Sequence, residues 1–148
     1  MKKQIMSSLA TLTLIIPMAI AGFAGLDARV KADIPFDFLV GGKQLPAGKY
    51  VVERLNATGA LIIRSTDNKQ AANFNVNNVT DRGSQEARLV FRRYGNQTFL
   101  AQIYDGLSNQ GQELPKSKQE REAAKKRDII TQNIIGPQIE TVVAEIAK

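Results

Sequence analysis

The residues with the greatest potential for chemistry lie between positions 87 and 104. This stretch combines cations with aromatic rings: Arg88, Phe91, Arg92, Arg93, Tyr94, Phe99 and Tyr104. Basic and aromatic side chains that share one face of a sheet can bind single-stranded nucleic acid through ion pairs and base stacking. The chemistry therefore depends on which way each side chain points, and hence on the strands that carry them.

Two apolar segments of equal length flank the pair Gly95-Asn96, a pattern that predicts a β-hairpin. Pairing of Tyr94 with Gln97 would divide the side chains into two sets: Arg88, Val90, Arg92, Tyr94, Phe99, Ala101 and Ile103 on one face, and Leu89, Phe91, Leu100 and Tyr104 on the other. Because both faces are apolar, the hairpin should lie centrally in a sheet that is covered on both sides.

The predicted register splits the aromatic rings between two faces, which argues against a nucleic-acid platform. Phe91 and Phe99 should be buried on opposite faces, each in a different layer of the core. Arg92 should lie at the rim with its charged end in water, so that truncating it would cost little stability. We predict no nucleic-acid partner, and retain Arg88, Arg92 and Tyr94 as a possible interaction surface.

Carboxylates offer little further chemistry. Paired carboxylates can hydrolyse glycosides at a suitable separation, and Asp33, Asp37 and Glu53 are the candidates that could converge early in the fold. Asp33 and Asp37 would share a strand face about 13 Å apart, at about 3.3 Å per residue, which is too far. The chain also has no His and no Cys, which removes the commonest acid–base group, thiolate nucleophiles and disulfides. We expect no enzymatic activity, no catalytic residue, no metal site and no cofactor.

The composition is that of one folded domain: 148 residues, 43% of them hydrophobic. The net charge is +6, but 4 of the 20 basic residues and 1 of the 14 acidic residues precede residue 33. The remaining 16 basic and 13 acidic residues leave +3, a small excess that gives weak support to a phosphate-binding surface.

Residues 1–32 are expected to be a secretory signal peptide. They contain Lys2-Lys3, an apolar stretch over 9–24 and small residues that end in Val30-Lys31-Ala32. Cleavage after Ala32 would leave a mature domain at 33–148, and Ala19-Ile20-Ala21 offers an earlier cleavage site. An uncleaved membrane anchor is the alternative, which Pro17 and the small-residue exit disfavour. We therefore expect an exported protein, periplasmic or extracellular, whose mature form does not span the membrane.

Strand and turn signals then recur at intervals of about 8–12 residues. Alternation over 34–39 ends at Gly41-Gly42, and further strands are expected at 49–55, 60–65 and 71–76, before a polar loop at 77–86. This succession predicts a mainly β domain, either a small antiparallel barrel or a two-sheet sandwich.

The C-terminal region adds one short helix. Residues 105–117 are expected to be a loop, and Ser117-Lys118-Gln119-Glu120 has the form of a capping box. The helix should run from about 118 to 127, with a thin buried face because Ala123 and Ala124 are its only apolar residues. Residues 138–146 fit either a helix by spacing or a last strand by β-branching, and we favour the strand.

Three blocks of the sequence resemble a family of small exported bacterial proteins. They are D-I-P-F-D-F-x-V-G-x-K-x-L-P-A-G-x-Y at 33–50, L-V-F-x-R-Y-G at 89–95 and E-L-P-K-S-x-x-E-R-E at 113–122. The resemblance covers most of the chain after residue 32 and is weakest beyond Arg127. It implies export and a shared β fold, and it assigns no functional residue.

These observations together favour a non-catalytic exported β domain that acts as a structural or interaction module of the cell envelope. Its partner would be an envelope component or another protein. The alternative is a carrier that holds a small apolar ligand in a barrel interior or in a cleft between sheets. A large apolar cavity would favour the carrier, and a filled core the module.

Overall fold

The structure, a computed structural model, describes residues 28–56, 58–81, 85–131 and 136–147, with only the backbone described at 128–131. The elements of these residues are β1 (Val30–Ile34), β2 (Phe38–Val40), β3 (Lys43–Leu45), β4 (Gly48–Arg54), β5 (Leu61–Ser65), β6 (Ala71–Phe74), β7 (Asn77–Thr80), β8 (Ala87–Tyr94), β9 (Gln97–Asp105), β10 (Gln110–Glu113), α1 (Lys118–Thr131) and β11 (Gln138–Ile146).

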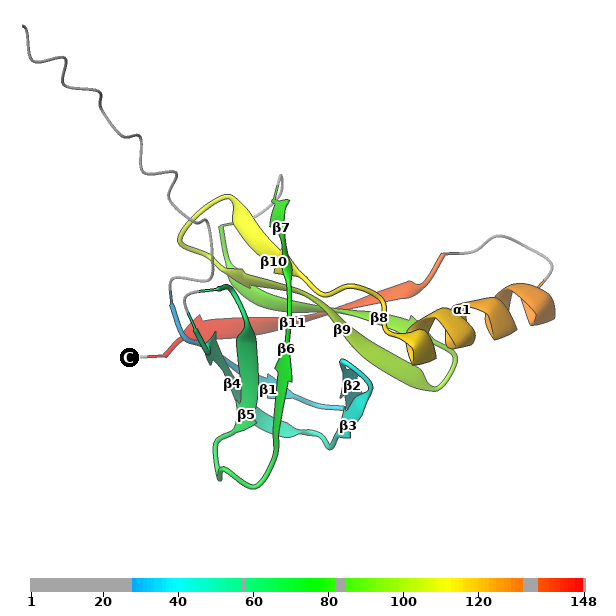
Figure 1. The fold of residues 1–148 in the computed structure, drawn as a ribbon, viewed down its shortest axis with the longest axis horizontal. Coiled ribbons are helices and arrows are strands. Elements are labelled where there is room, and N and C mark those ends of the chain that lie inside the picture. The colour runs from blue at the N-terminus through cyan, green and yellow to red at the C-terminus, as the bar shows by residue number, and fades with distance from the viewer. Residues whose placement is uncertain (1–27, 57, 82–84, 132–135, 148) are drawn as a thin grey trace, which may run out of the picture.

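The strands form one sheet that curls until it nearly closes into a barrel (Figure 1). Its strand order is β3-β2-β9-β8-β11-β1-β4-β5-β6, and neighbours are antiparallel except for the short β2–β9 contact. The free edge of β9 is shared, because β2 pairs with it at Phe99 and β10 pairs with it from Gln102 to Tyr104. The prediction of a mainly β fold with one short helix is confirmed, and of the two architectures the protein adopts the barrel.

The two ends of the sheet meet through a side chain. Lys43 in β3 donates a hydrogen bond from Nζ to the carbonyl oxygen of Ala71 in β6, over 2.7 Å. The β2–β3 turn lies against the same strand, since a Cβ added at Gly41 would be 3.9 Å from the carbonyl oxygen of Asn73. These contacts connect strands that do not pair by a backbone ladder.

Aromatic side chains fill the barrel interior. Phe91 packs edge-to-face against Phe36 and Phe38, with ring centroids 5.1 and 5.6 Å apart, and Phe38 packs in the same way against Tyr50 at 5.2 Å. Phe38, Phe91 and Tyr50 are each 1% exposed or less. The layer is completed by aliphatic residues from β1 to β5, β8 and β9: Val30, Ile34, Val40, Leu45, Val52, Leu61, Ile63, Leu89, Leu100 and Ile103.

The barrel begins earlier in the chain than we expected. The predicted domain boundary after Ala32 falls inside β1, whose Val30 and Ala32 are 0% and 4% exposed. The single strand expected at 34–39 is interrupted, since β1 ends at Ile34 and β2 begins at Phe38. Pro35 has no N–H to offer a neighbouring strand, which explains why pairing stops there.

Two predicted loops contain strands. β7 and β10 pair with each other, from Asn77↔Glu113 to Thr80↔Gln110, and β10 joins this ribbon to β9. Their sequences, NNVT and QGQE, lack the apolar alternation that identifies a half-buried strand. The last segment is a strand as we favoured: β11 pairs with both β8 and β1, and thereby brings the end of the chain into the barrel wall.

Candidate functional site

The β8–β9 hairpin has the predicted turn, but its faces differ because of a β-bulge. Tyr94 pairs with Gln97, and Gly95 takes a positive φ of 62° as the turn requires. The ladder shifts between Val90, opposite Gln102, and Phe91, opposite Leu100. One extra residue in β9, Ala101, therefore reverses the side chains that follow it.

Because of the bulge, two of the predicted side-chain directions were wrong, those of Ile103 and Tyr104. Ile103 joins the barrel core with Leu89, whereas Tyr104 lies on the outer face next to Arg88. The other directions are as expected, since Phe91 is in the barrel core and Phe99 is in a second cluster outside it. The prediction that Phe91 and Phe99 are buried on opposite faces is confirmed.

The helix packs on the outer face of the hairpin through few apolar atoms. The second cluster contains Leu39, Tyr94 and Phe99 from the strands and Ala123 from the helix, with Ala124 at its margin. The ring centroids of Tyr94 and Phe99 are 5.9 Å apart. Since alanine contributes little area, the hydrophobic effect alone holds this helix weakly.

A buried ion pair supplements that packing. Arg92 donates from Nε to Glu120 Oε1 over 2.6 Å and from Nη2 to Glu120 Oε2 over 3.4 Å. The hydroxyl of Tyr94 donates to the same Oε1 over 3.3 Å, and Arg92 also donates to the carbonyl oxygen of Leu114 and to Glu113. Arg92 is 9% exposed and Glu120 is 2% exposed, so both charges are withdrawn from water. We call Arg92, Tyr94 and Glu120 the helix anchor.

Glu120 was assigned only a capping role in the sequence analysis. The backbone part of the cap forms, because the N–H of Glu120 donates to Ser117 Oγ over 3.1 Å. The carboxylate is bonded to Arg92 and Tyr94 of β8. One sequence feature could have indicated this contact. The helix has a thin apolar face, so a polar contact was needed to hold it against the sheet.

The predicted interaction surface is therefore divided and largely covered. Arg92 and Tyr94 meet at the helix anchor, where both are buried, and the expectation that Arg92 is a solvated rim residue was wrong. Arg88 lies farther along β8, where its guanidinium is 2.7 Å from Asp81 and 4.0 Å from the ring centroid of Tyr104. Gly111 in β10 pairs with Tyr104, and a Cβ atom at this position would clash with the Tyr104 ring.

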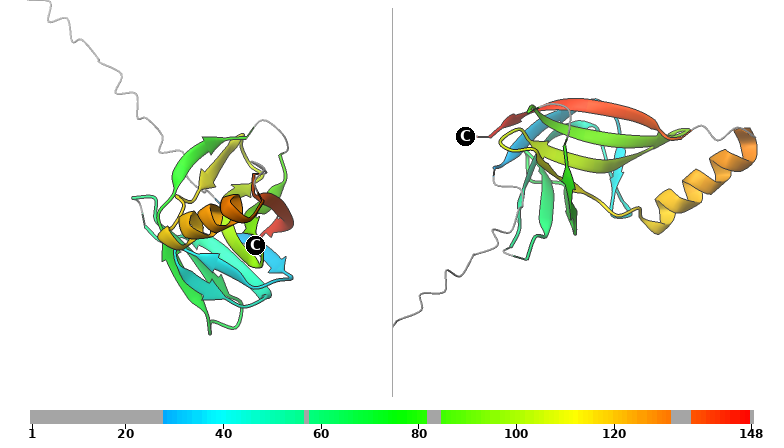
Figure 2. Two further views of the ribbon diagram at one scale, coloured as in Figure 1. Left: turned by 90° about the vertical axis from the view of Figure 1, so that its right-hand side faces the viewer. Right: turned by 90° about the horizontal axis from the view of Figure 1, so that it is seen from above.

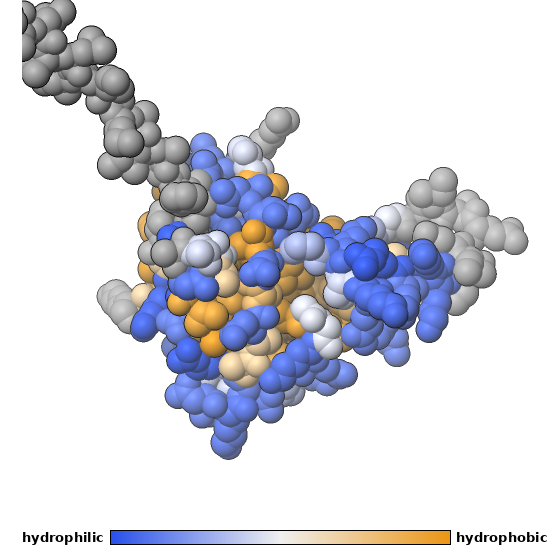
Figure 3. Space-filling view, in the orientation of Figure 1, coloured by the Kyte–Doolittle hydropathy of each residue, from blue (hydrophilic) through white to orange (hydrophobic). Residues whose placement is uncertain are grey.

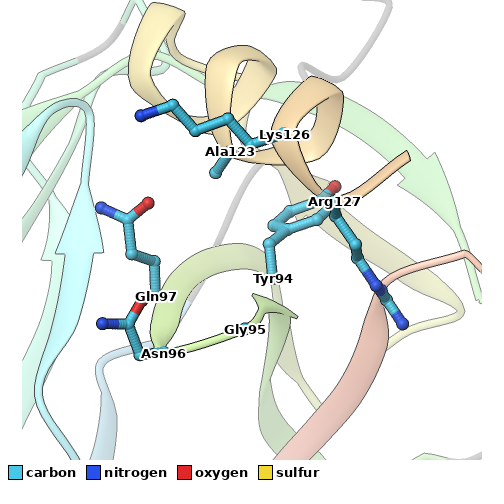
Figure 4. A pocket seen from close by; sticks show the side chains of 7 residues that line it. All are labelled: Tyr94, Gly95, Asn96, Gln97, Ala123, Lys126 and Arg127. Carbon is cyan, nitrogen blue, oxygen red and sulfur yellow. The ribbon is translucent and has the colours of Figure 1, made fainter. Parts of the chain in front are cut away.

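A groove lies between the hairpin turn and α1 (Figure 4). It has a volume of about 360 Å³ and is lined by Tyr94, Gly95, Asn96, Gln97, Ala123, Lys126 and Arg127. Lys126 and Gln97 lie on one side of it, and the ring of Tyr94 rises on the other toward the helix (Figure 4). The groove offers the amides of Asn96 and Gln97 and the ammonium group of Lys126 as donors above an apolar base, which suits binding of an acidic or polar segment. We call this groove, with the exposed surface of α1, the candidate interaction site.

The carboxylates considered for glycoside chemistry are not brought together. Asp37 lies in the bend between β1 and β2, and its Oδ1 accepts a hydrogen bond from the backbone N–H of Ala47, between β3 and β4, over 2.9 Å. Glu53 in β4 is held between Arg29 and Arg64, at 2.9 and 3.2 Å. Among the residues that the structure describes, no group of three or more Asp or Glu could hold a metal ion.

All three tyrosines carry buried phenols, which leads to a testable pH dependence. Burial raises the pKa of Tyr50, Tyr94 and Tyr104 above the ordinary value of about 10, and nearby carboxylates add to this: Asp67 and Asp37, Glu120, and Asp81, respectively. Because the unfolded chain ionises its phenols at the lower pH, stability should be complete below about pH 10 and fall as the pH rises beyond it. Tyrosinate absorbance should therefore appear at a higher pH in the folded protein than in protein unfolded in urea, which titrates near the ordinary value. Half-ionisation near pH 10 in protein that is still folded would contradict this burial.

Comparison with protein-family models, with curated proteins and with solved structures found no match to this chain. In the described residues, no helix is long and apolar enough to cross a membrane.

Proposed function

We propose that the protein is an exported, non-catalytic interaction module of the cell envelope, which presents α1 and the β8–β9 turn to a partner. The observation that supports this most is the helix anchor. Burying Arg92 and Glu120 removes both from water, a cost that their attraction offsets only with good geometry. A buried ion pair is thus a poor device for stability alone but a good one for fixing orientation, and here it fixes the orientation of α1.

The packing of the barrel supports the module over the carrier. The space in which a carrier would hold an apolar ligand is occupied by the rings of Phe38, Phe91 and Tyr50. The candidate interaction site instead lies outside the barrel, beside the helix.

Export is proposed from the leader-like sequence of residues 1–32. The position of β1 constrains where a leader can be removed. Cleavage after Ala32 would remove Val30 and Ala32 from the core, with their pairing to Val52 and Tyr50 in β4. We therefore propose cleavage at the earlier A-x-A site, after Ala21, which leaves β1 intact.

One experiment tests location and site together. A photo-crosslinking amino acid is placed at Asn96, in the groove, or at Thr66, an exposed residue in the β5–β6 turn as a control. After irradiation of living cells, the protein is recovered from the envelope fraction and its N-terminus is sequenced. We expect a discrete adduct from the Asn96 position alone, on protein whose N-terminus lies before Arg29. Recovery only from the cytoplasm with Met1 intact would contradict export, and equal adduct yields from both positions would contradict the assigned site.

A further inference from the structure

The exposed surface of α1 is strongly basic. Five cations are exposed on the helix and just before it: Lys116, Lys118, Arg121, Lys125 and Lys126. Of the two glutamates among them, Glu120 is buried in the helix anchor and only Glu122 is exposed. We call the five exposed cations the basic face.

The helical spacing gathers three of these charges on the side away from the barrel, whereas Lys126 lines the groove beside the hairpin turn. Lys118, Arg121 and Lys125 stand at i, i+3 and i+7, which places them on one stripe about 10 Å long, at about 1.5 Å per residue. Glu120 and Ala123 occupy the opposite side of the helix, against the hairpin. The stripe is therefore turned outward by the same contacts that dock the helix.

Ion pairing is more common among the cations of the barrel. Five of them are paired with carboxylates: Arg29 and Arg64 with Glu53, Lys69 with Asp67, Arg88 with Asp81, and Arg93 with Glu140. Within the described parts of the chain, none of the five cations of the basic face forms an ion pair. Their charges are therefore not neutralised by carboxylates of the described residues.

We propose that the basic face binds an anionic lipid surface, an inference that rests on α1 being the interaction element. Clusters of four to eight Lys and Arg on a helix are typical of binding to anionic headgroups. The helix projects beyond the end of the barrel (Figure 2), so a flat surface can approach it, and most of its surface that is visible in Figure 3 is hydrophilic. A protein hot spot would need aromatic or other large anchors, which this stripe lacks.

The test uses the mature protein, which by the proposed cleavage begins at Gly22, and vesicles of phosphatidylcholine, with or without about one-third phosphatidylglycerol. Each Lys or Arg near such a surface contributes roughly fivefold to the partition constant, so Lys118→Gln/Arg121→Gln/Lys125→Gln should weaken binding about a hundredfold at low salt. The matched control, Lys31→Gln/Lys49→Gln/Lys69→Gln, removes the same charge from exposed barrel positions and should change binding little. Glu122→Gln should strengthen it, and all the variants should melt close to the parent because these side chains are exposed.

Three results would overturn the inference. They are equal binding to neutral vesicles, equal weakening by both triple variants, and binding of a polyglutamate peptide without binding to the anionic vesicles. Binding of polyglutamate without binding to anionic vesicles would leave α1 as the interaction element and would indicate an acidic protein as its partner. If the crosslink at Asn96 forms but the protein does not bind the anionic vesicles, the lipid inference is wrong and the proposed function as an interaction module still stands.

Discussion

Replacing Phe91 with alanine is expected to lower the free energy of unfolding by about 3–5 kcal/mol, a large share of the roughly 5–15 kcal/mol typical of a domain. Phe91 is 0% exposed, and its ring contacts those of Phe36 and Phe38. Removal would leave a cavity in the barrel interior, and the hydrogen-bonded strands of the wall limit how far the surrounding structure can close it. Urea unfolding followed by circular dichroism measures the change.

Phe99→Ala provides the comparison on the other face of the same hairpin. Phe99 is 3% exposed and packs with Tyr94 beneath the helix, so its loss should also be severe but should loosen α1 before the barrel. A mild Phe91→Ala would contradict the filled interior and would revive the carrier as an explanation.

The second large effect is expected at Arg92. Arg92→Ala leaves the carboxylate of Glu120, which is 2% exposed, without its main partner. Breaking a buried ion pair in this way costs about 3–5 kcal/mol. The sequence alone predicted a mild effect, because the thin apolar face of the helix did not identify Arg92 as the residue that the helix covers.

Two variants separate the buried pair from an ordinary surface charge. Arg93→Ala removes the neighbouring guanidinium, whose pairing with Glu140 is partly exposed, and should cost less than about 1 kcal/mol. Replacing both Arg92 and Glu120 with Met should recover most of the stability, since no charge is then left alone in the interior. Equal losses of unfolding free energy for Arg92→Ala and Arg93→Ala would contradict the burial of the Arg92–Glu120 pair and would indicate that Arg92 is a solvated residue at the rim of the sheet.

The sequence was most informative where a local rule decides the structure. The Gly95-Asn96 turn and its flanking β-branched and aromatic residues specified the hairpin, and alternation specified the burial of Phe91 and Phe99. The final strand was also foreseen from the β-branching of Thr141, Val142 and Val143.

Other features depend on contacts that no local pattern encodes. Nothing in the run from Phe99 to Tyr104 marks Ala101 as the bulge, yet this residue decides that Tyr104 faces outward. The pairing of Arg92 with Glu120 joins residues 28 apart in the chain. β7 and β10 are polar strands whose pairing is determined by their position beside β9, so hydrophobic periodicity gave no signal for them.

The central claim is that the helix anchor holds α1 in one orientation on the barrel, and hydrogen exchange tests it most directly. Without tertiary support, a helix of this length is marginal in water and its amides should exchange rapidly. We predict that amides from Glu120 to Arg127 are protected in the parent protein, and that Arg92→Ala removes this protection while leaving β1, β4 and β8 protected. Rapid exchange throughout α1 in the parent protein would contradict the account, because the helix would then have no fixed surface to present.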